Sequence, residues 1–163
     1  MVDNSWITRI TFKERVVEEL LIGTYEHNMD AKNRVIMPAK FREVIGDKFC
    51  LTLGFDGCIR AYSETEWNKY KERFEGLPES NQNARRIQRL IFANSCDCEV
   101  DKQGRVIIPP NLLKHAELDK NVVIIGQSTY IEIWAKERWT TYQPEEETVS
   151  LEELIGSLSE YGL

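Results

Sequence analysis

Residues 30–38 read Asp30-Ala31-Lys32-Asn33-Arg34-Val35-Ile36-Met37-Pro38, and residues 101–109 repeat the pattern as Asp101-Lys102-Gln103-Gly104-Arg105-Val106-Ile107-Ile108-Pro109. The match continues downstream with one residue inserted. The further pairs are Gly54 with Gly126, Ile59 with Ile131, Tyr62 with Trp134, Trp67 with Trp139 and Tyr70 with Tyr142. An internal repeat of this kind indicates two copies of one structural unit.

Each copy places a turn between two short stretches that favour strands. These stretches are residues 24–29 and 35–37 in the first copy, and 97–100 and 106–108 in the second. The leading aspartate can accept hydrogen bonds from the turn backbone. Asn33 and Gly104 stand where a left-handed conformation closes a three-residue loop. Each copy is therefore predicted to form a β-hairpin with the pattern D-x-x-x-R at its tip.

The rest of each copy predicts a short helix, two strands and a closing helix. Pro38 and Pro109 end the second hairpin strand and suit the start of a helix. Ser63 and Glu66 are spaced as a capping box for the first closing helix. The other expected ranges are 39–45, 49–53 and 58–62 in the first copy, and 110–116, 122–125 and 130–134 in the second.

These patterns divide the chain into five parts. The parts are an extension over 1–20, a first module over 21–76, a connecting helix over 77–95, a second module over 96–142 and an acidic amphipathic helix over 143–163. The extension matches neither copy, and we hypothesise that it is upstream sequence translated in frame. The last helix, with Ser150 and Glu153 as its cap, is expected to pack on its own body or on a neighbouring subunit.

The connecting helix separates two kinds of side chain. Ala84, Ile87 and Ile91 share one stripe at helical spacing. The arginines of this helix lie off that stripe, and we expect them to form a solvated or salt-bridged face, with contact to DNA as the alternative. They are Arg85, Arg86 and Arg89.

Composition places the chain among globular proteins of the cytoplasm. At 163 residues and 42% apolar content it can bury a core, and it has neither a membrane-length apolar stretch nor a secretory signal. The cysteines lack the C-x2-C spacing of zinc sites, so free thiols, no metal and no cofactor are expected. They are Cys50, Cys58, Cys96 and Cys98.

The net charge of −6 comes from the C-terminal segment. Six carboxylates and no basic residue follow Gln143, so residues 1–142 are neutral in sum. A neutral body can still present a basic face, and affinity for nucleic acid depends on that face.

Catalysis has little support in this sequence. The two histidines are far apart, and no phosphate-binding or nucleophile-elbow motif is present, so no small-molecule substrate is expected. Asp30 and Asp101 could form a shared-proton dyad if the copies brought them together. The cations beside each of them, such as Arg34 and Arg105, would instead hold both carboxylates ionised.

The repeated tips suit the recognition of double-stranded DNA. A two-stranded ribbon fits the major groove, and a guanidinium such as that of Arg34 or Arg105 can bond guanine in bidentate fashion. The alternative for each arginine is a surface ion pair with its own aspartate. Nearby cations would neutralise phosphates, and these are Lys32, Lys40, Arg42 and Lys102. One base contact discriminates by only about 1–3 kcal/mol, so a homo-oligomer is expected to act on repeated DNA boxes.

Several stretches together resemble the MraZ family of bacterial regulators, over roughly residues 21–143. They are Gly23-Thr24-Tyr25-Glu26-His27, the two tips, Ala39-Lys40-Phe41-Arg42, Leu90-Ile91-Phe92-Ala93-Asn94 and Ile131-Glu132-Ile133-Trp134. The resemblance implies an α+β, mostly β fold. Two tandem AbrB-like swapped-hairpin modules would form an intrachain pseudo-dimer β-barrel with flanking helices.

The resemblance also implies a function. The protein would be a nucleoid-associated homo-oligomer, in the form of a ring, that binds direct repeats upstream of its own division and cell-wall operon as a repressor. Arg34 and Arg105 would read DNA, with Asp30 and Asp101 as companions and with Asn33 and Gly104 supporting the turns. The competing hypothesis is a ring-forming scaffold that binds proteins through its acidic tail.

Overall fold

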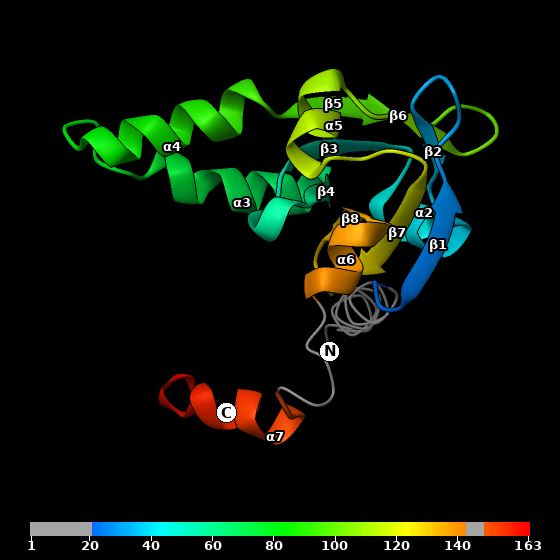
Figure 1. Cartoon of the computed structure of the whole chain (residues 1–163). Coiled ribbons are helices and arrows are strands. Elements are labelled where there is room, and N and C mark those ends of the chain that lie inside the picture. The colour runs from blue at the N-terminus through cyan, green and yellow to red at the C-terminus, as the bar shows by residue number, and fades with distance from the viewer. Residues whose placement is uncertain (1–20, 143–148) are drawn as a thin grey trace, which may run out of the picture.

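The computed structural model describes residues 21–142 and 149–163 (Figure 1). The predicted extension over 1–20, and the start of the acidic tail at 143–148, lie outside the described residues. The first copy comprises β1 (Thr24–Asn28), β2 (Arg34–Ile36), α2 (Ala39–Ile45), β3 (Lys48–Leu53), the short helix η1 (Phe55–Gly57), β4 (Ile59–Ser63) and α3 (Glu64–Glu75). The helix α4 (Gln82–Ala93) then leads to the second copy.

The second copy repeats the order of the first. It comprises β5 (Cys96–Glu99), β6 (Arg105–Ile107), α5 (Pro110–Ala116), β7 (Asn121–Gly126), β8 (Ile131–Ala135) and α6 (Lys136–Tyr142). The C-terminal segment forms α7 (Leu151–Ser157) and the turn of helix η2 (Ser159–Tyr161). The helices predicted over 39–45 and 110–116 are confirmed.

The two copies are interleaved in one six-stranded antiparallel sheet of order β1-β7-β8-β4-β3-β5. The first strand of each copy pairs with a strand of the other copy, because β1 lies beside β7 and β5 lies beside β3. The central pair, β4 and β8, also joins the copies. The expectation that the two arms of each hairpin pair with each other is therefore wrong beyond the tip.

The second hairpin strands form a separate two-stranded ribbon. In this ribbon β2 and β6 run antiparallel, with Val35 opposite Val106 at the centre. Two flanking bonds extend it, since the N–H of Met37 donates to Gly104 and that of Ile108 donates to Asn33. Each copy thus supplies one strand to the ribbon.

A closed β-barrel is not formed by the described strands. The larger sheet is open, with β1 and β5 as its edges, and the ribbon is a sheet of its own. Pro38 and Pro109 follow the ribbon strands closely and lack the backbone N–H that a longer ladder would need. The ribbon therefore ends after a few pairs instead of continuing into the larger sheet.

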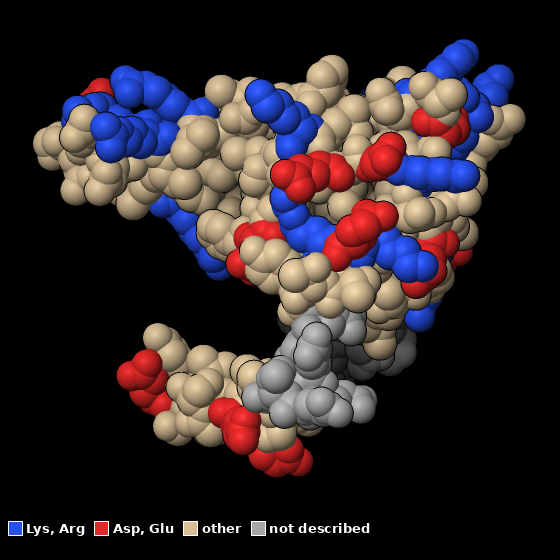
Figure 2. Space-filling model, in the orientation of Figure 1, with Lys and Arg blue, Asp and Glu red and all other residues tan. Residues whose placement is uncertain are grey.

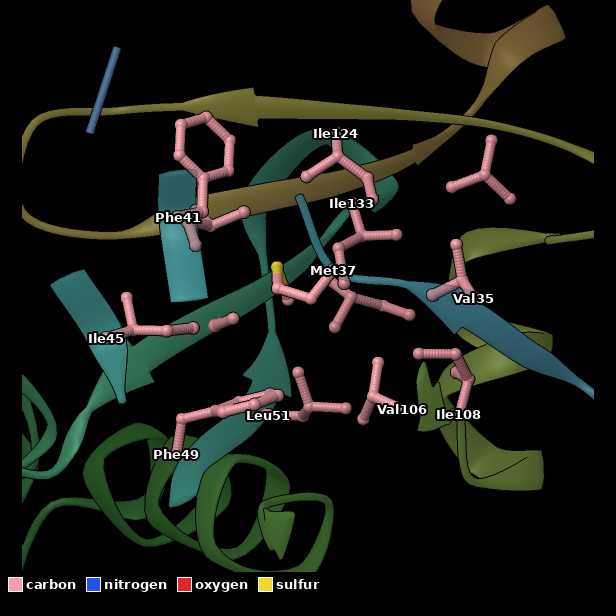
Figure 3. Packing of buried hydrophobic residues seen from close by; sticks show 14 of the residues in the cluster. Val35, Met37, Phe41, Ile45, Phe49, Leu51, Val106, Ile108, Ile124 and Ile133 are labelled. Atoms are coloured by element: carbon pink, nitrogen blue, oxygen red, sulfur yellow. The ribbon is translucent and has the colours of Figure 1, made fainter. Parts of the chain in front are cut away.

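The core lies between the ribbon and the six-stranded sheet (Figure 3). Val35 and Val106 point inward from the ribbon and are 1% exposed. They lie in one cluster with side chains from β3, β7 and β8, among them Leu51, Ile124 and Ile133. Burial of each such side chain stabilises the fold by about 1.5–3 kcal/mol, so the core holds the base of both hairpins in place.

Helices α3 and α4 form an arm that projects from the sheet (Figure 1). The hydroxyl of Ser63 accepts the N–H of Glu66 at the start of α3, as the capping pattern predicts. The Gln88 side chain donates to the Phe74 carbonyl at 2.6 Å and ties the two helices together. Within residues 21–142 and 149–163, no helix has the length and apolar character required to cross a lipid bilayer.

Candidate nucleic-acid interface

The tip of the first hairpin is built around the carboxylate of Asp30. Its Oδ1 accepts the backbone N–H groups of Lys32 and Arg34, each at 2.9 Å. Its Oδ2 accepts Nε of the Arg34 side chain at 2.7 Å. Asn33 closes the loop with a φ of 58°, as the turn pattern predicts.

The second tip repeats this geometry. Oδ1 of Asp101 accepts the N–H groups of Gln103 and Arg105 at 2.9 Å, and Oδ2 accepts Nε of Arg105 at 2.8 Å. Gly104 has a φ of 78°, the counterpart of Asn33. In both copies one aspartate therefore fixes the turn and the direction of its arginine.

The aspartate occupies only the Nε side of each guanidinium. Within residues 21–142 and 149–163, no hydrogen bond involves Nη1 or Nη2 of Arg34 or Arg105. Their side chains are 22% and 28% exposed. The ion pair considered as an alternative thus exists, yet each arginine keeps two donor nitrogens for a ligand.

The hairpin aspartates are held in the charged form. The pKa of Asp30 is lowered, chiefly by the backbone N–H of Arg34, and the Arg34 side chain and the N–H of Lys32 add to this against partial desolvation. The pKa of Asp101 is lowered in the same way, first by the backbone N–H of Arg105. Each carboxylate is committed to its own turn, which does not fit the shared proton of an acid dyad.

The ribbon presents both arginines on one face. Cross-strand partners and alternate residues of a strand share a face, and Arg34 lies opposite Ile107 while Ile36 lies opposite Arg105. The other face carries the two buried valines. Ile36 and Ile107 are accordingly exposed, at 44% and 62%. The sequence analysis did not single out these isoleucines, although their spacing of two from each arginine is the signal that places them.

Further cations lie in the tips and on the helix that follows β2. Lys32 and Lys102 are exposed within the two tips, and Lys40 is exposed on α2. Figure 2 shows basic side chains gathered at the corner where the two tips of Figure 1 lie together, with carboxylates close by. Arg42 is placed differently, since its guanidinium lies against the backbone of Gly104 and its buried Nε has no partner among the described atoms.

The four cysteines are free thiols. Cys50 and Cys58 are buried, and the sulfur atoms of Cys96 and Cys98 lie 3.4 Å apart on β5. Among the described residues no cluster of three or more His, Cys, Asp or Glu side chains could hold a metal ion.

Comparison with known proteins gives one consistent result. A family model described as "MraZ protein, putative antitoxin-like" matches twice, over residues 20–90 and 91–154. A protein named Transcriptional regulator MraZ from Caldanaerobacter subterraneus subsp. tengcongensis is 46% identical over 88% of this chain and 100% of its own length. Proteins of the same name from Lachnoclostridium phytofermentans and Clostridium acetobutylicum are 44% identical over 88% of this chain, and over 99% and 100% of theirs.

Proposed function

We propose, from the premise that this chain belongs to the MraZ family, that it is a transcriptional regulator which binds promoter DNA through the outer face of its ribbon. The observation that carries the proposal is the placement of Arg34 and Arg105 on one exposed face, each held through Nε by its own aspartate. A two-stranded β-ribbon has the width to enter the major groove. A guanidinium held on one side is preorganised for a bidentate contact on the other.

The surrounding residues divide into three proposed roles. Arg34 and Arg105 contact guanine, and Ile36 and Ile107 contact thymine methyl groups between them. The lysines bind phosphates and set the register, and they are Lys32, Lys40 and Lys102. Arg42 braces the second tip and neutralises a phosphate beside it, while Asn33 and Gly104 allow the turns that aim the arginines.

Membership of the same family supports a more specific regulatory role. We propose repression of the chain's own division and cell-wall operon, through direct repeats in its promoter and with the protein concentrated on the nucleoid. A homo-oligomer, closed as a ring, would engage several repeats at once and gain affinity through effective concentration. The interleaved copies would be the intrachain counterpart of an AbrB-like swapped-hairpin dimer.

The test is a fluorescence anisotropy titration with DNA from upstream of the chain's own gene. The double variant R34A/R105A removes both proposed base contacts, each of which is expected to contribute about 1–3 kcal/mol. Its affinity should fall by at least tenfold while its circular dichroism stays unchanged. The matched control is Arg73→Ala, an exposed arginine on α3 far along the chain from either tip, which should bind like the parent.

A second pair of variants separates base reading from charge. R34K/R105K keeps the charge but removes the planar fork and the bond from Nε to aspartate. This variant should retain salt-dependent binding to any DNA and lose its preference for the promoter. Equal promoter affinity of the parent and the double alanine variant would contradict the proposal, and would favour the scaffold hypothesis if removal of the acidic tail then abolished partner binding.

A further inference from the structure

Two thiols meet on one face of the strand β5. Cys96 and Cys98 are alternate residues of this strand, so their side chains point to the same face. Their sulfur atoms lie 3.4 Å apart and share a hydrogen bond. A disulfide bond measures about 2.05 Å, so a small approach of the two sulfur atoms would join them. We call these two residues the thiol pair.

The other two cysteines are placed less well for a bond to this pair. Cys50 of β3 lies opposite Asp97, and directly opposed residues share a face, so Cys50 and the thiol pair belong to opposite faces of the sheet. Cys58 of β4 is fully buried, and its sulfur donates to the carboxylate of Glu132. The disulfide that the fold favours is therefore the one within β5.

The thiol pair is accessible to a small molecule. Both side chains pack against the core but remain partly exposed, and β5 is an edge strand that pairs only with β3 among the described strands. Cys98 also borders an open cavity of about 420 Å³, whose walls include Phe49 and Trp67. The hydrogen bond with Cys98 lowers the pKa of Cys96 despite partial burial, and the thiolate is the nucleophilic form. Cys96 is thus the sulfur that attacks, with Cys98 beside it as the second thiol.

We propose that the thiol pair is a redox site, which a hydroperoxide such as hydrogen peroxide closes to a disulfide within β5, and that closure disturbs the second hairpin tip. In the first step the Cys96 thiolate attacks one peroxide oxygen and breaks the O–O bond, which leaves a sulfenic acid on Cys96 and releases hydroxide. The sulfur of Cys98 then bonds to that of Cys96, the S–O bond breaks, and the oxygen leaves as water with the thiol proton of Cys98. Two electrons pass from the two sulfur atoms to the peroxide.

Closure of the disulfide shortens β5. Alternate residues of a strand lie about 6.4–6.8 Å apart at Cα, at the upper end of the range of about 4.4–6.8 Å that disulfides span. An edge strand can pucker because it is held on one side only. The backbone then leads directly to the second tip, through Val100, whose N–H donates to Asp47, and on to Asp101. The equivalent strand of the first copy, β1, contains no cysteine, so only the second tip should respond.

The disulfide is tested on the reduced full chain, treated with an equal amount of hydrogen peroxide and then with iodoacetamide in denaturant. Trypsin releases both thiols in one peptide, residues 90–102. This peptide should lose two hydrogen atoms, take up no iodoacetamide and regain both labelling sites after dithiothreitol, whereas Cys50 and Cys58 should be labelled throughout. Cys98→Ser should instead accumulate a sulfenic acid on Cys96, which dimedone traps. A thiol pair that stays reduced, or a disulfide to Cys50 or Cys58, would overturn the proposal.

Hydrogen exchange measures the effect on the two tips. In the oxidised chain the amides of residues 96–105 should exchange at least about tenfold faster than in the reduced chain, and those of residues 24–34 should not change. Dithiothreitol should restore slow exchange, which separates the disulfide from oxidation of methionine. The matched control is C96S/C98S, which should exchange alike before and after peroxide. Exchange of the second tip that does not change on oxidation would refute the link between the disulfide and this tip.

The consequence for DNA rests on the proposed function. Because Arg105 stands in the second tip, the oxidised chain should bind promoter DNA about tenfold more weakly, the loss expected for one base contact, and dithiothreitol should restore the affinity. If R34A/R105A binds the promoter like the parent, the proposed function fails while the disulfide and exchange results stand. If that variant loses binding but oxidation leaves the affinity unchanged, the proposed function stands and the redox site does not regulate it.

Discussion

The guanidinium of Arg42, in the first copy, lies directly on the backbone of Gly104 at the second hairpin tip. A Cβ at Gly104 would stand 2.5 Å from Nη1 and 2.6 Å from Cζ of Arg42. In the internal repeat, Asn33 of the first copy is the counterpart of Gly104, and Leu113 of the second copy is the counterpart of Arg42. Asn33 is exposed. The turn position thus holds asparagine in the first copy and glycine in the second, and the helix position holds arginine in the first copy and leucine in the second.

Replacing Gly104 with alanine should destabilise the protein by about 1–3 kcal/mol. The left-handed backbone costs about 1–2 kcal/mol for a residue other than glycine, and the new methyl group would also displace Arg42. Arg42→Ala in the same chain should remove the clash with the new methyl group. The double variant should therefore lose less free energy of unfolding than the sum of the losses of the two single variants. Denaturant unfolding measures all three variants.

The control for this change is Asn33→Gly, which alters the same turn position in the first copy. Asn33 already has a positive φ and is exposed, so its replacement should change the free energy of unfolding by no more than about 0.5 kcal/mol. Additive losses in the double variant G104A/R42A would show that the close approach has no energetic consequence.

Changing Ile36 and Ile107 to serine should weaken promoter binding while leaving stability almost unchanged. Both side chains are exposed on the arginine face, and surface substitutions usually change stability by less than about 0.5 kcal/mol. The loss should be confined to promoter DNA, since these side chains carry no charge for the phosphate backbone. Anisotropy with promoter and random DNA measures the ratio, and an equal loss on both would contradict the assignment.

The hairpin aspartates should make the protein less stable in acid but leave it insensitive to pH near neutrality. Their pKa values are lowered in the folded state from an ordinary value of 3.8. The unfolded chain therefore takes up protons first as the pH falls, and the stabilisation is complete above 3.8 and lost below it. D30N/D101N should be less stable than the parent at pH 7, and the gap should narrow below pH 3.8. Thermal unfolding across this range tests the sign, and a gap that widens in acid would refute it.

The four thiols should differ sharply in reactivity. Burial raises the pKa of Cys50 to about 12 and raises that of Cys58 further. The pKa of Cys96 is lowered by its hydrogen bond with the sulfur of Cys98, whose own pKa is raised by the same bond. Because the thiolate is the reactive form, iodoacetamide at pH 8 should label Cys96 first. Peptide mass spectrometry reads the order, with the denatured chain, in which all four should react alike, as the control.

The sequence by itself determined what local chemistry controls. Asp30 and Asp101 accept hydrogen bonds from residues no more than four positions away, and the turn at Asn33 or Gly104 needs only a residue that tolerates a positive φ. The short helices after the two prolines depend equally on neighbouring residues. The repeat itself was visible because equivalent positions keep the same residue types.

Only the tertiary structure decided which strands pair and which apolar side chains face solvent. Equivalent strands of the two copies carry the same pattern, so no local signal distinguishes a strand's own copy from the other, and β1 pairs with β7 instead of β2. Ile36 and Val35 look alike in sequence. Their fates differ because the ribbon has one face on the core and one in solvent, and that difference arises only when strands distant in the chain are packed together.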